Sequence, residues 1–98
     1  MADPVQFVED TVEEVLRLRS QDLEWREIEG EVVVLDLRTS TYMAVNNTGY
    51  VLWKSLAEGA ARSQLVSEIT ERFDLEEDTA ERDVDDFVDS LRRAHILE

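Results

Sequence analysis

The side chains best suited to chemistry in this sequence are its carboxylates and its single histidine, and neither group is arranged as a catalytic site. The acidic residues recur at spacings typical of solvated helix faces, whereas a general acid–base pair must face one cleft with different proton affinities. His95 follows Arg92 and Arg93 near a predicted helix end, where a cation suits the helix dipole. It has no second histidine or cysteine with which to bind a metal. We therefore predict no enzymatic activity and no cofactor.

Cysteine is absent, which excludes disulfides, thiolate nucleophiles and cysteine-based zinc sites together. The acidic run from Asp74 to Asp86 has the density of a calcium-binding loop but lacks the required glycine and terminal glutamate. No stretch approaches the roughly 20 apolar residues that span a bilayer, and the start, MADPVQFVED, lacks the order of an export signal. These features predict a cytoplasmic protein without a metal site.

The negative charge narrows the classes of partner. The 98-residue chain has 24 acidic and 10 basic residues, for a formal net charge of −14. A field of this sign repels phosphate backbones and anionic lipid, so we expect neither nucleic acid nor a membrane as partner. Two interpretations stay open: the charge keeps copies of a small protein apart, or it attracts a basic face on a partner enzyme or peptide.

One segment of the sequence has the features needed to bind a peptide, although none has those needed for catalysis. Residues 41–45 (TYMAV) form a predicted strand without the charges or proline that normally protect a sheet edge against pairing. Unpaired amides and carbonyls on such an edge can hydrogen-bond an extended peptide, while pockets between the strand and a helix select its sequence. We therefore predict peptide binding by strand addition at Thr41, Tyr42, Met43, Ala44 and Val45.

This prediction has a direct mutational test. If the strand is a free edge, proline at Met43 should abolish peptide binding with modest loss of folding, because the lost donor then serves only an added strand. The alternative is that another strand or a second copy of the chain covers this edge.

A helix near the end of the chain is the expected opposite wall of the site. It is predicted from about Ala80 to Ala94, with apolar side chains at helical spacing and acidic ones largely outside. Because the same apolar stripe could serve as core, periodicity does not decide which face is free. The residues of this helix that we assign to peptide binding are Val84, Asp85, Val88, Leu91 and Arg92.

The elements that must hold this site come in the order strands, then helices. Alternating apolar residues predict a strand from Val15 onward and further strands over residues 23–28 and 31–37, with a hairpin turn at Glu29-Gly30. With the strand at residues 41–45, they precede all the helical patterns. This order predicts an α+β, winged-helix-like fold, with an N-terminal three-stranded antiparallel sheet followed by three helices.

Two further helices are predicted before the last one. Three candidate N-caps, Asn46-Asn47-Thr48, precede a helix that ends at Glu58-Gly59, and Ser63 is expected to cap a second helix that reaches Phe73. The aromatic residues could suggest base stacking, but that platform needs a positive groove. Periodicity instead assigns the aromatics to the core: Trp25, Tyr42, Tyr50, Trp53, Phe73 and Phe87.

Three segments together resemble the PqqD-like family of precursor-peptide recognition proteins. They are GEVVVLDLRTSTYMAVNNTGYVLWKSLAEG (residues 30–59), LVSEITERFDL (65–75) and DVDDFVDSLRRAHIL (83–97). The combination of LDL, Y-x-x-V-N-x-T-G, LW and D-V-x-x-F-x-x-L is fairly specific, and the resemblance covers about residues 15–98. The sequence departs from the family pattern where glycine, leucine and proline are usual, at Ser40, Val45 and Asn47 respectively.

The resemblance implies a winged-helix recognition element that binds the leader of a ribosomally made precursor peptide and presents it to a modifying enzyme. In relatives the leader adds to the third strand and lies against the third helix, which correspond here to residues 41–45 and 83–93. The implied enzyme is a leader peptidase, as in lasso-peptide pathways, or a radical-SAM enzyme, as in pyrroloquinoline quinone (PQQ) biosynthesis. We predict a non-catalytic chaperone that is a monomer or weak homodimer. Its predicted parts are residues 1–14, a tail or short helix, and residues 15–98, the peptide-recognition domain.

Helix order alone would also allow a winged-helix DNA-binding transcriptional regulator. Its recognition helix would be residues 63–73, where Arg72 stands against Glu68 and Glu71. That is not a basic reading surface, so leader recognition is the favoured hypothesis.

Overall fold

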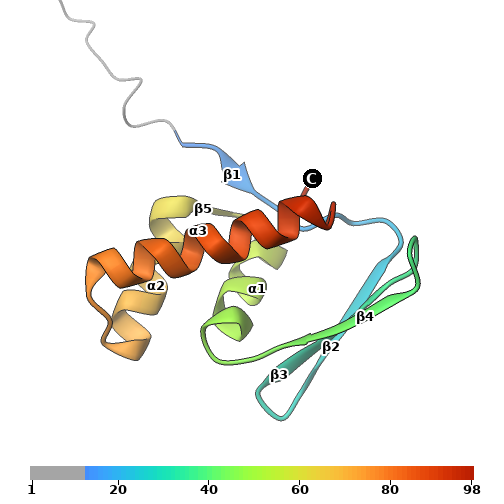
Figure 1. The fold of residues 1–98 in the computed structure, drawn as a ribbon, viewed down its shortest axis with the longest axis horizontal. Helices are drawn as coiled ribbons and strands as arrows, with labels where there is room; N and C mark the ends of the chain where they lie inside the picture. The colour runs from blue at the N-terminus through green and yellow to red at the C-terminus, as the bar shows by residue number, and fades with distance from the viewer. Residues whose placement is uncertain (1–12) are drawn as a thin grey trace, which may run out of the picture.

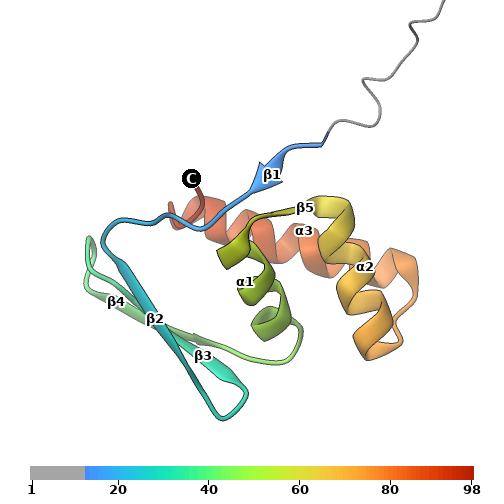
Figure 2. The ribbon, with the colours of Figure 1, turned by 180° about the vertical axis from the view of Figure 1, so that it is seen from behind.

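A three-stranded antiparallel sheet stands beside three packed helices (Figure 1). The computed structural model describes residues 13–98, so the predicted tail or short helix at residues 1–14 lies largely outside the described residues. The α+β class and the order of sheet, then helices, are confirmed. In Figure 1 the sheet lies at one end of the molecule and the helices at the other, and Figure 2 shows the same arrangement from behind.

The sheet consists of β2 (Leu23–Ile28), β3 (Glu31–Asp36) and β4 (Thr41–Val45), in the spatial order β2-β3-β4. A two-residue turn joins the first two strands, and both its residues have positive φ, 53° at Glu29 and 80° at Gly30. Positive φ at both positions matches a type I′ turn, whose twist suits a hairpin. The predicted hairpin is thus present, and β3 is the central strand.

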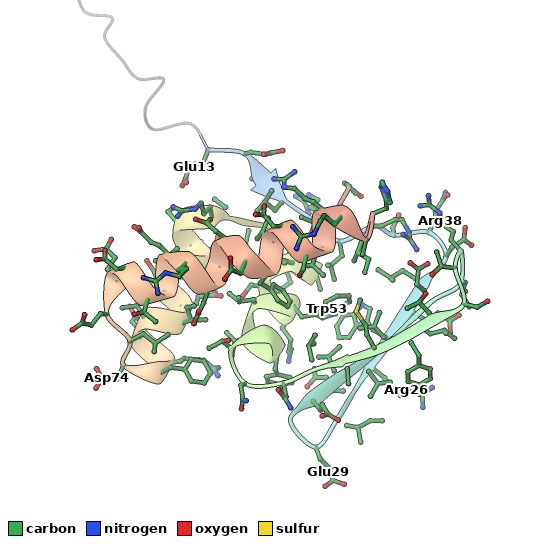
Figure 3. The ribbon with its side chains drawn as sticks, viewed as in Figure 1. Glu13, Arg26, Glu29, Arg38, Trp53 and Asp74 are labelled. Atoms are coloured by element: carbon green, nitrogen blue, oxygen red, sulfur yellow. The ribbon has the colours of Figure 1, made fainter. Side chains whose placement is uncertain are left out.

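The core lies between the inner face of the sheet and the helices. Val32 and Val34 of β3 are fully buried, and so is Trp53, whose side chain lies between the first helix and the sheet (Figure 3). The Trp25 ring meets Trp53 edge-on, with centroids 6.1 Å apart and planes at 78°. Such an edge-to-face pair is a favoured aromatic geometry. Trp53 is therefore the largest buried side chain of the core, and Trp25 covers it from the sheet while remaining partly exposed.

Two of the three helices begin earlier than the sequence predicts. The helices are α1 (Thr48–Glu58), α2 (Arg62–Phe73) and α3 (Glu77–Arg93). Ser63 does not cap α2, because Ala61 precedes the helix and the Ser63 hydroxyl instead donates to a Glu13 carboxylate oxygen. The first turn of α3 carries Glu77 and Asp78, which suit a helix N-terminus electrostatically but look like a polar linker in a hydropathy pattern.

The predicted strand from Val15 does not join the three-stranded sheet. Only Val15–Leu16 form a strand, β1, and it pairs with β5 (Ala60–Ala61), which lies between α1 and α2. An isolated bridge from Leu18 to Leu97 then ties this segment to the chain end. In both views β1 and the sheet lie on different sides of α3 (Figures 1 and 2).

Of the six aromatic residues predicted to lie in the core, only Trp53 is fully buried. Trp25 is 37% exposed, Phe73 38% and Tyr42 70%. Tyr42 alternates outward on β4, to the face of the sheet that no helix covers among the described residues, and Phe73 is the last residue of its helix. Periodicity identifies the apolar face of an element, but it does not show whether another element covers that face.

Candidate functional site

The outer edge of β4 is open among the described residues. β4 pairs with β3 over its whole length, and residues 13–98 contain no strand on its other side. The five residues of β4 carry no charge and no proline, so nothing in the strand discourages further pairing. This segment is therefore able to accept an additional strand.

The strand register decides which backbone groups of β4 face that edge. The two-residue turn makes Ile28 and Glu31 a hydrogen-bonded pair, and bonded and non-bonded pairs then alternate along the ladder. Odd-numbered residues of β3 therefore bond to β2, and even-numbered ones bond to β4. Their partners on β4 are Thr41, Met43 and Val45. The N–H and C=O groups that point away from the sheet accordingly belong to Tyr42 and Ala44.

This register corrects the expectation for proline at Met43. The Met43 amide lies opposite Val34 in a bonded pair, so its loss would break the sheet itself. Ala44 is the position where a lost donor affects only an added strand.

The side chains of β4 divide between the two faces of the sheet. Met43 and Val45 lie half-buried on the inner face and pack against the core, whereas Tyr42 and Ala44 are exposed on the outer face. A strand added to β4 would alternate in the same way. Every second side chain of that strand would face inward, toward the helices.

Phe87 of α3 lies close to the end of the open strand, at the point where α1 begins. A Cβ placed on Gly49, in the first turn of α1, would lie 3.3 Å from Phe87 Cε1 and 3.4 Å from Val45 Cβ. Gly49 therefore lets three elements converge: the end of β4, the start of α1 and the middle of α3. Figure 1 shows β4 and α3 on the same side of the molecule, running in opposite directions.

The structure does not bring the five predicted α3 residues to β4. Val84 and Leu91 are buried in the core, with 0% and 3% exposure, and Val88 is 8% exposed. Asp85 accepts two hydrogen bonds from Arg62 at the start of α2, at 2.7 and 3.0 Å. Arg92 lies 3.7 Å from Glu14, next to β1. Val88, Asp85 and Arg92 thus belong to the side of α3 that faces β1.

Helix geometry identifies the residues that line the β4 side instead. At about 100° per residue, Asp83, Ser90 and Ala94 lie within about 60° of Phe87 on the side away from Val88. Asp83 and Phe87 are half-exposed, and Ser90 and Ala94 are exposed. Sequence reasoning missed these residues, although the phenylalanine of D-V-x-x-F-x-x-L was a signal for them.

Comparison with known proteins assigns the chain to a family. The family model described as coenzyme PQQ synthesis protein D (PqqD) matches residues 31–97. The chain belongs to the PqqD family. None of the curated protein sequences compared with it matches.

Two solved structures resemble this PqqD-family chain over most of its length. One is TbiB1 in complex with the TbiA(beta) leader peptide, with a TM-score of 0.77 and 32% identity over 84% of this chain and 94% of that one. The other is lasso peptide synthetase B1 complexed with the leader peptide, with a TM-score of 0.75 and 25% identity over 85% and 96%. Both relatives are thus leader-peptide complexes, and neither comparison names a nucleic acid.

At two positions where the sequence departs from the PqqD pattern, the backbone has a positive φ angle. Ser40, where glycine is usual, has φ 56°, in the left-handed region that glycine adopts most easily. Asn47, where proline is common, also has φ 56°, a value that the proline ring forbids. The turn before β4 therefore keeps the backbone conformation that glycine usually provides. The residue before α1, in contrast, adopts a conformation that the proline common at this position could not adopt.

The other sheet edge, on β2, is less suited to pairing. β2 carries Glu24, Arg26 and Glu27, and charges on an edge strand oppose the addition of another strand. The Glu27 carboxylate accepts a hydrogen bond from the Tyr50 hydroxyl at 2.8 Å and lies 2.8 Å from Lys54 Nζ. The Lys54 and then the Tyr50 hydrogen bond lower the pKa of Glu27, and Glu27 raises the pKa of Lys54 and of Tyr50. This network ties β2 to α1.

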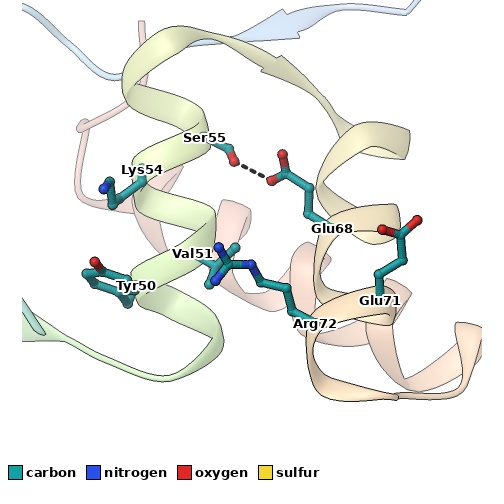
Figure 4. A pocket seen from close by; sticks show the side chains of 7 residues that line it. All are labelled: Tyr50, Val51, Lys54, Ser55, Glu68, Glu71 and Arg72. Atoms are coloured by element: carbon teal, nitrogen blue, oxygen red, sulfur yellow. Dashed lines mark hydrogen bonds between the residues drawn. The ribbon is translucent and has the colours of Figure 1, made fainter. Parts of the chain in front are cut away.

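A hollow of about 300 Å³ lies between α1 and α2 (Figure 4). Lys54 and Arg72 line it together with Glu68 and Glu71, and the Ser55 hydroxyl bonds to Glu68 across it. Its charges are mixed, and its walls belong to two helices without an open strand. The part of the chain that the structure describes has no cluster of His, Cys, Asp or Glu placed to hold a metal ion. It also has no helix both long and apolar enough to cross a membrane.

Proposed function

We propose that this protein captures the leader segment of a ribosomally made precursor peptide by strand addition to β4. Residues 15–98 serve as the recognition domain, and the chain has no catalytic step of its own. The leader pairs with the backbone of Tyr42 and Ala44, and its inward side chains lie over Met43 and Val45 against α3.

The observation that carries this proposal is the open edge of β4. An uncharged strand with two residues directed outward is costly to leave unused, because such edges promote aggregation unless a partner is meant to cover them. The similarity to two leader-peptide complexes supports the same occupant. Backbone pairing supplies affinity in this mode, and side-chain contacts supply selectivity.

The proposed partner downstream is a leader peptidase of a lasso-peptide pathway. Support comes from the relative named lasso peptide synthetase B1, whereas the name of the matching family points to PQQ synthesis. Because the precursor is made on the ribosome, the proposed site of leader binding is the cytoplasm. Pairing of two β4 edges would compete with the leader for the same amides, so the leader-bound form is a monomer.

The test is a titration of the ¹⁵N-labelled protein with the leader of a precursor encoded beside its gene. Saturable shifts should concentrate on the amides of Tyr42 and Ala44, with smaller ones at Phe87 and Ser90. The amides of β2 serve as the internal control, because that strand is the other edge of the same sheet. Shifts concentrated on β2, or the absence of saturable binding, would refute the proposal.

A further inference from the structure

The wall of α3 beside β4 changes charge along its length. Asp83 lies one turn before Phe87 on the β4 side, and Asp86 lies at the outer rim of that side, about 100° from Phe87. Arg93 occupies the same rim near the other end of the helix. Neither carboxylate forms an ion pair within residues 13–98, and neither does Arg93. Beside Phe87 the wall is thus acidic through Asp83, and its outer rim is basic at the end of α3 through Arg93, while Arg82 lies about 140° from Phe87, beyond Asp86 and Arg93.

The two ends of this wall correspond to the two ends of β4. Val45 and Phe87 both lie against Gly49, so the end of β4 meets the acidic part of α3. Because β4 and α3 run in opposite directions (Figure 1), Thr41 lies toward the basic end. A peptide paired with β4 would therefore pass an acidic rim beside Val45 and a basic one beside Thr41.

Between these charged positions, the part of the wall nearest to β4 is mainly apolar. Phe87, Met43 and Val45 are half-buried and form its apolar part, and Ser90 and Ala94 are small. An inward-facing apolar side chain of the added strand fits over these residues, and its neighbours two positions away face the rims, because inward positions alternate. Backbone pairing alone does not distinguish one peptide from another, so these side-chain contacts set the choice.

We infer that this site selects leaders with a cationic side chain at the Val45 end of the added strand, two positions from an inward-facing apolar residue. This inference rests on the proposed strand addition and specifies the peptide class that it accepts. Asp83 makes the main contact because it adjoins Phe87, and Asp86 reinforces it. Contacts of this exposed kind are modest, so each carboxylate changes affinity by about two- to fivefold. They weaken as salt is added.

The test is selection from random peptides displayed on phage, against the wild-type chain and two variants. Asp83→Lys reverses the charge beside Phe87, whereas Asp89→Lys makes the same change at a position about 160° around the helix from Phe87 and about 120° from Asp83. Both raise the net charge from −14 to −12, so general attraction of basic peptides falls equally in each. Asp83→Asn, which keeps the side-chain shape, is the second variant at the site if the lysine impairs folding.

The wild-type chain and Asp89→Lys should both enrich Lys or Arg at one fixed distance from an apolar residue. Asp83→Lys should enrich Asp or Glu there, and Asp83→Asn should lose the preference. Identical selections by Asp83→Lys and Asp89→Lys would overturn the inference, as would a wild-type selection without a cationic position. If strand addition itself were wrong, the result would differ: the enriched peptides would bind an Ala44→Pro variant as well as they bind the wild-type chain.

Discussion

Arg19 and Asp36 form a nearly buried ion pair, with Arg19 Nη2 2.7 Å from Asp36 Oδ1. The two side chains are only 11% and 6% exposed. The Arg19 guanidinium also donates to the backbone carbonyls of Gln21, Asp22 and His95, at 2.7, 2.9 and 2.6 Å. One side chain therefore joins the end of β3 to the segment that follows α3. This junction fixes the sheet against the helix that walls the proposed site.

Arg19→Gln should lower the free energy of unfolding because it leaves Asp36 buried without its cation and leaves the Gln21 and His95 carbonyls without a donor, whereas the Asp22 carbonyl keeps the N–H of Leu37. Arg92→Gln is the matched control, since Arg92 lies 3.7 Å from Glu14 and both side chains are largely exposed. We expect a clear fall in the urea midpoint for the first variant and almost none for the second. Equal midpoints would show that the Arg19 junction is not structural.

Asp36 should also make stability depend on pH in the acid range. The hydrogen bond from Arg19, and then the backbone N–H of Arg38, hold the pKa of Asp36 below its ordinary value of 3.8. A carboxyl whose pKa is lower in the folded state stabilises the fold fully above its unfolded pKa. That contribution is lost as the pH falls from about 3.8 through the folded value.

The measurement is urea unfolding from neutral pH down to about pH 2. The wild-type chain should lose more stability in that range than Asp36→Asn, whose side chain does not titrate. Parallel curves for the two proteins would contradict the assignment. Asp85 gives an exposed comparison, because its pKa is also lowered by its hydrogen bonds from Arg62.

Much of the fold could be predicted because each element carries its own local signal. The Glu29-Gly30 turn and the alternation in β3 identify the hairpin, and the composition of β4 identifies an unprotected edge. The side of α3 that faces β4 is not decided by a local signal, although Phe87 points to it. It depends on the contact of Gly49 with Phe87, which joins residues distant in the sequence, and an apolar stripe with both Val88 and Phe87 does not reveal which of them faces the strand.

Trp53→Ala should lower the free energy of unfolding by about 3 to 5 kcal/mol, because the side chain is fully buried and its removal leaves a cavity. The control is Trp25→Ala, which removes the partner ring of the edge-to-face pair from a position that is 37% exposed. It should cost less than half as much. Chemical denaturation followed by circular dichroism measures both, and a smaller loss for Trp53 would refute its place in the core.

Two adjacent proline substitutions separate the two sides of β4. Ala44→Pro removes a donor that points away from the sheet, so folding should survive while affinity for a leader peptide falls about tenfold or more. Met43→Pro removes a donor that bonds to β3 and should destabilise the sheet itself. Thermal unfolding and peptide titration of both variants provide the comparison. Severe unfolding by Ala44→Pro together with tolerance at Met43 would mean that the register is reversed.

Ser40→Gly should stabilise the protein, because Ser40 has φ 56° in the turn between β3 and β4. A side chain with a Cβ pays about 1 to 2 kcal/mol in that region, and the greater freedom of glycine in the unfolded chain offsets part of the gain. We expect a net increase of about 0.5 to 1 kcal/mol. Ser67→Gly, in the exposed face of α2, is the matched control and should instead cost about 0.5 kcal/mol, because glycine is a poor helix former. Denaturation midpoints that fall in both variants would show that the turn does not hold Ser40 in the left-handed region.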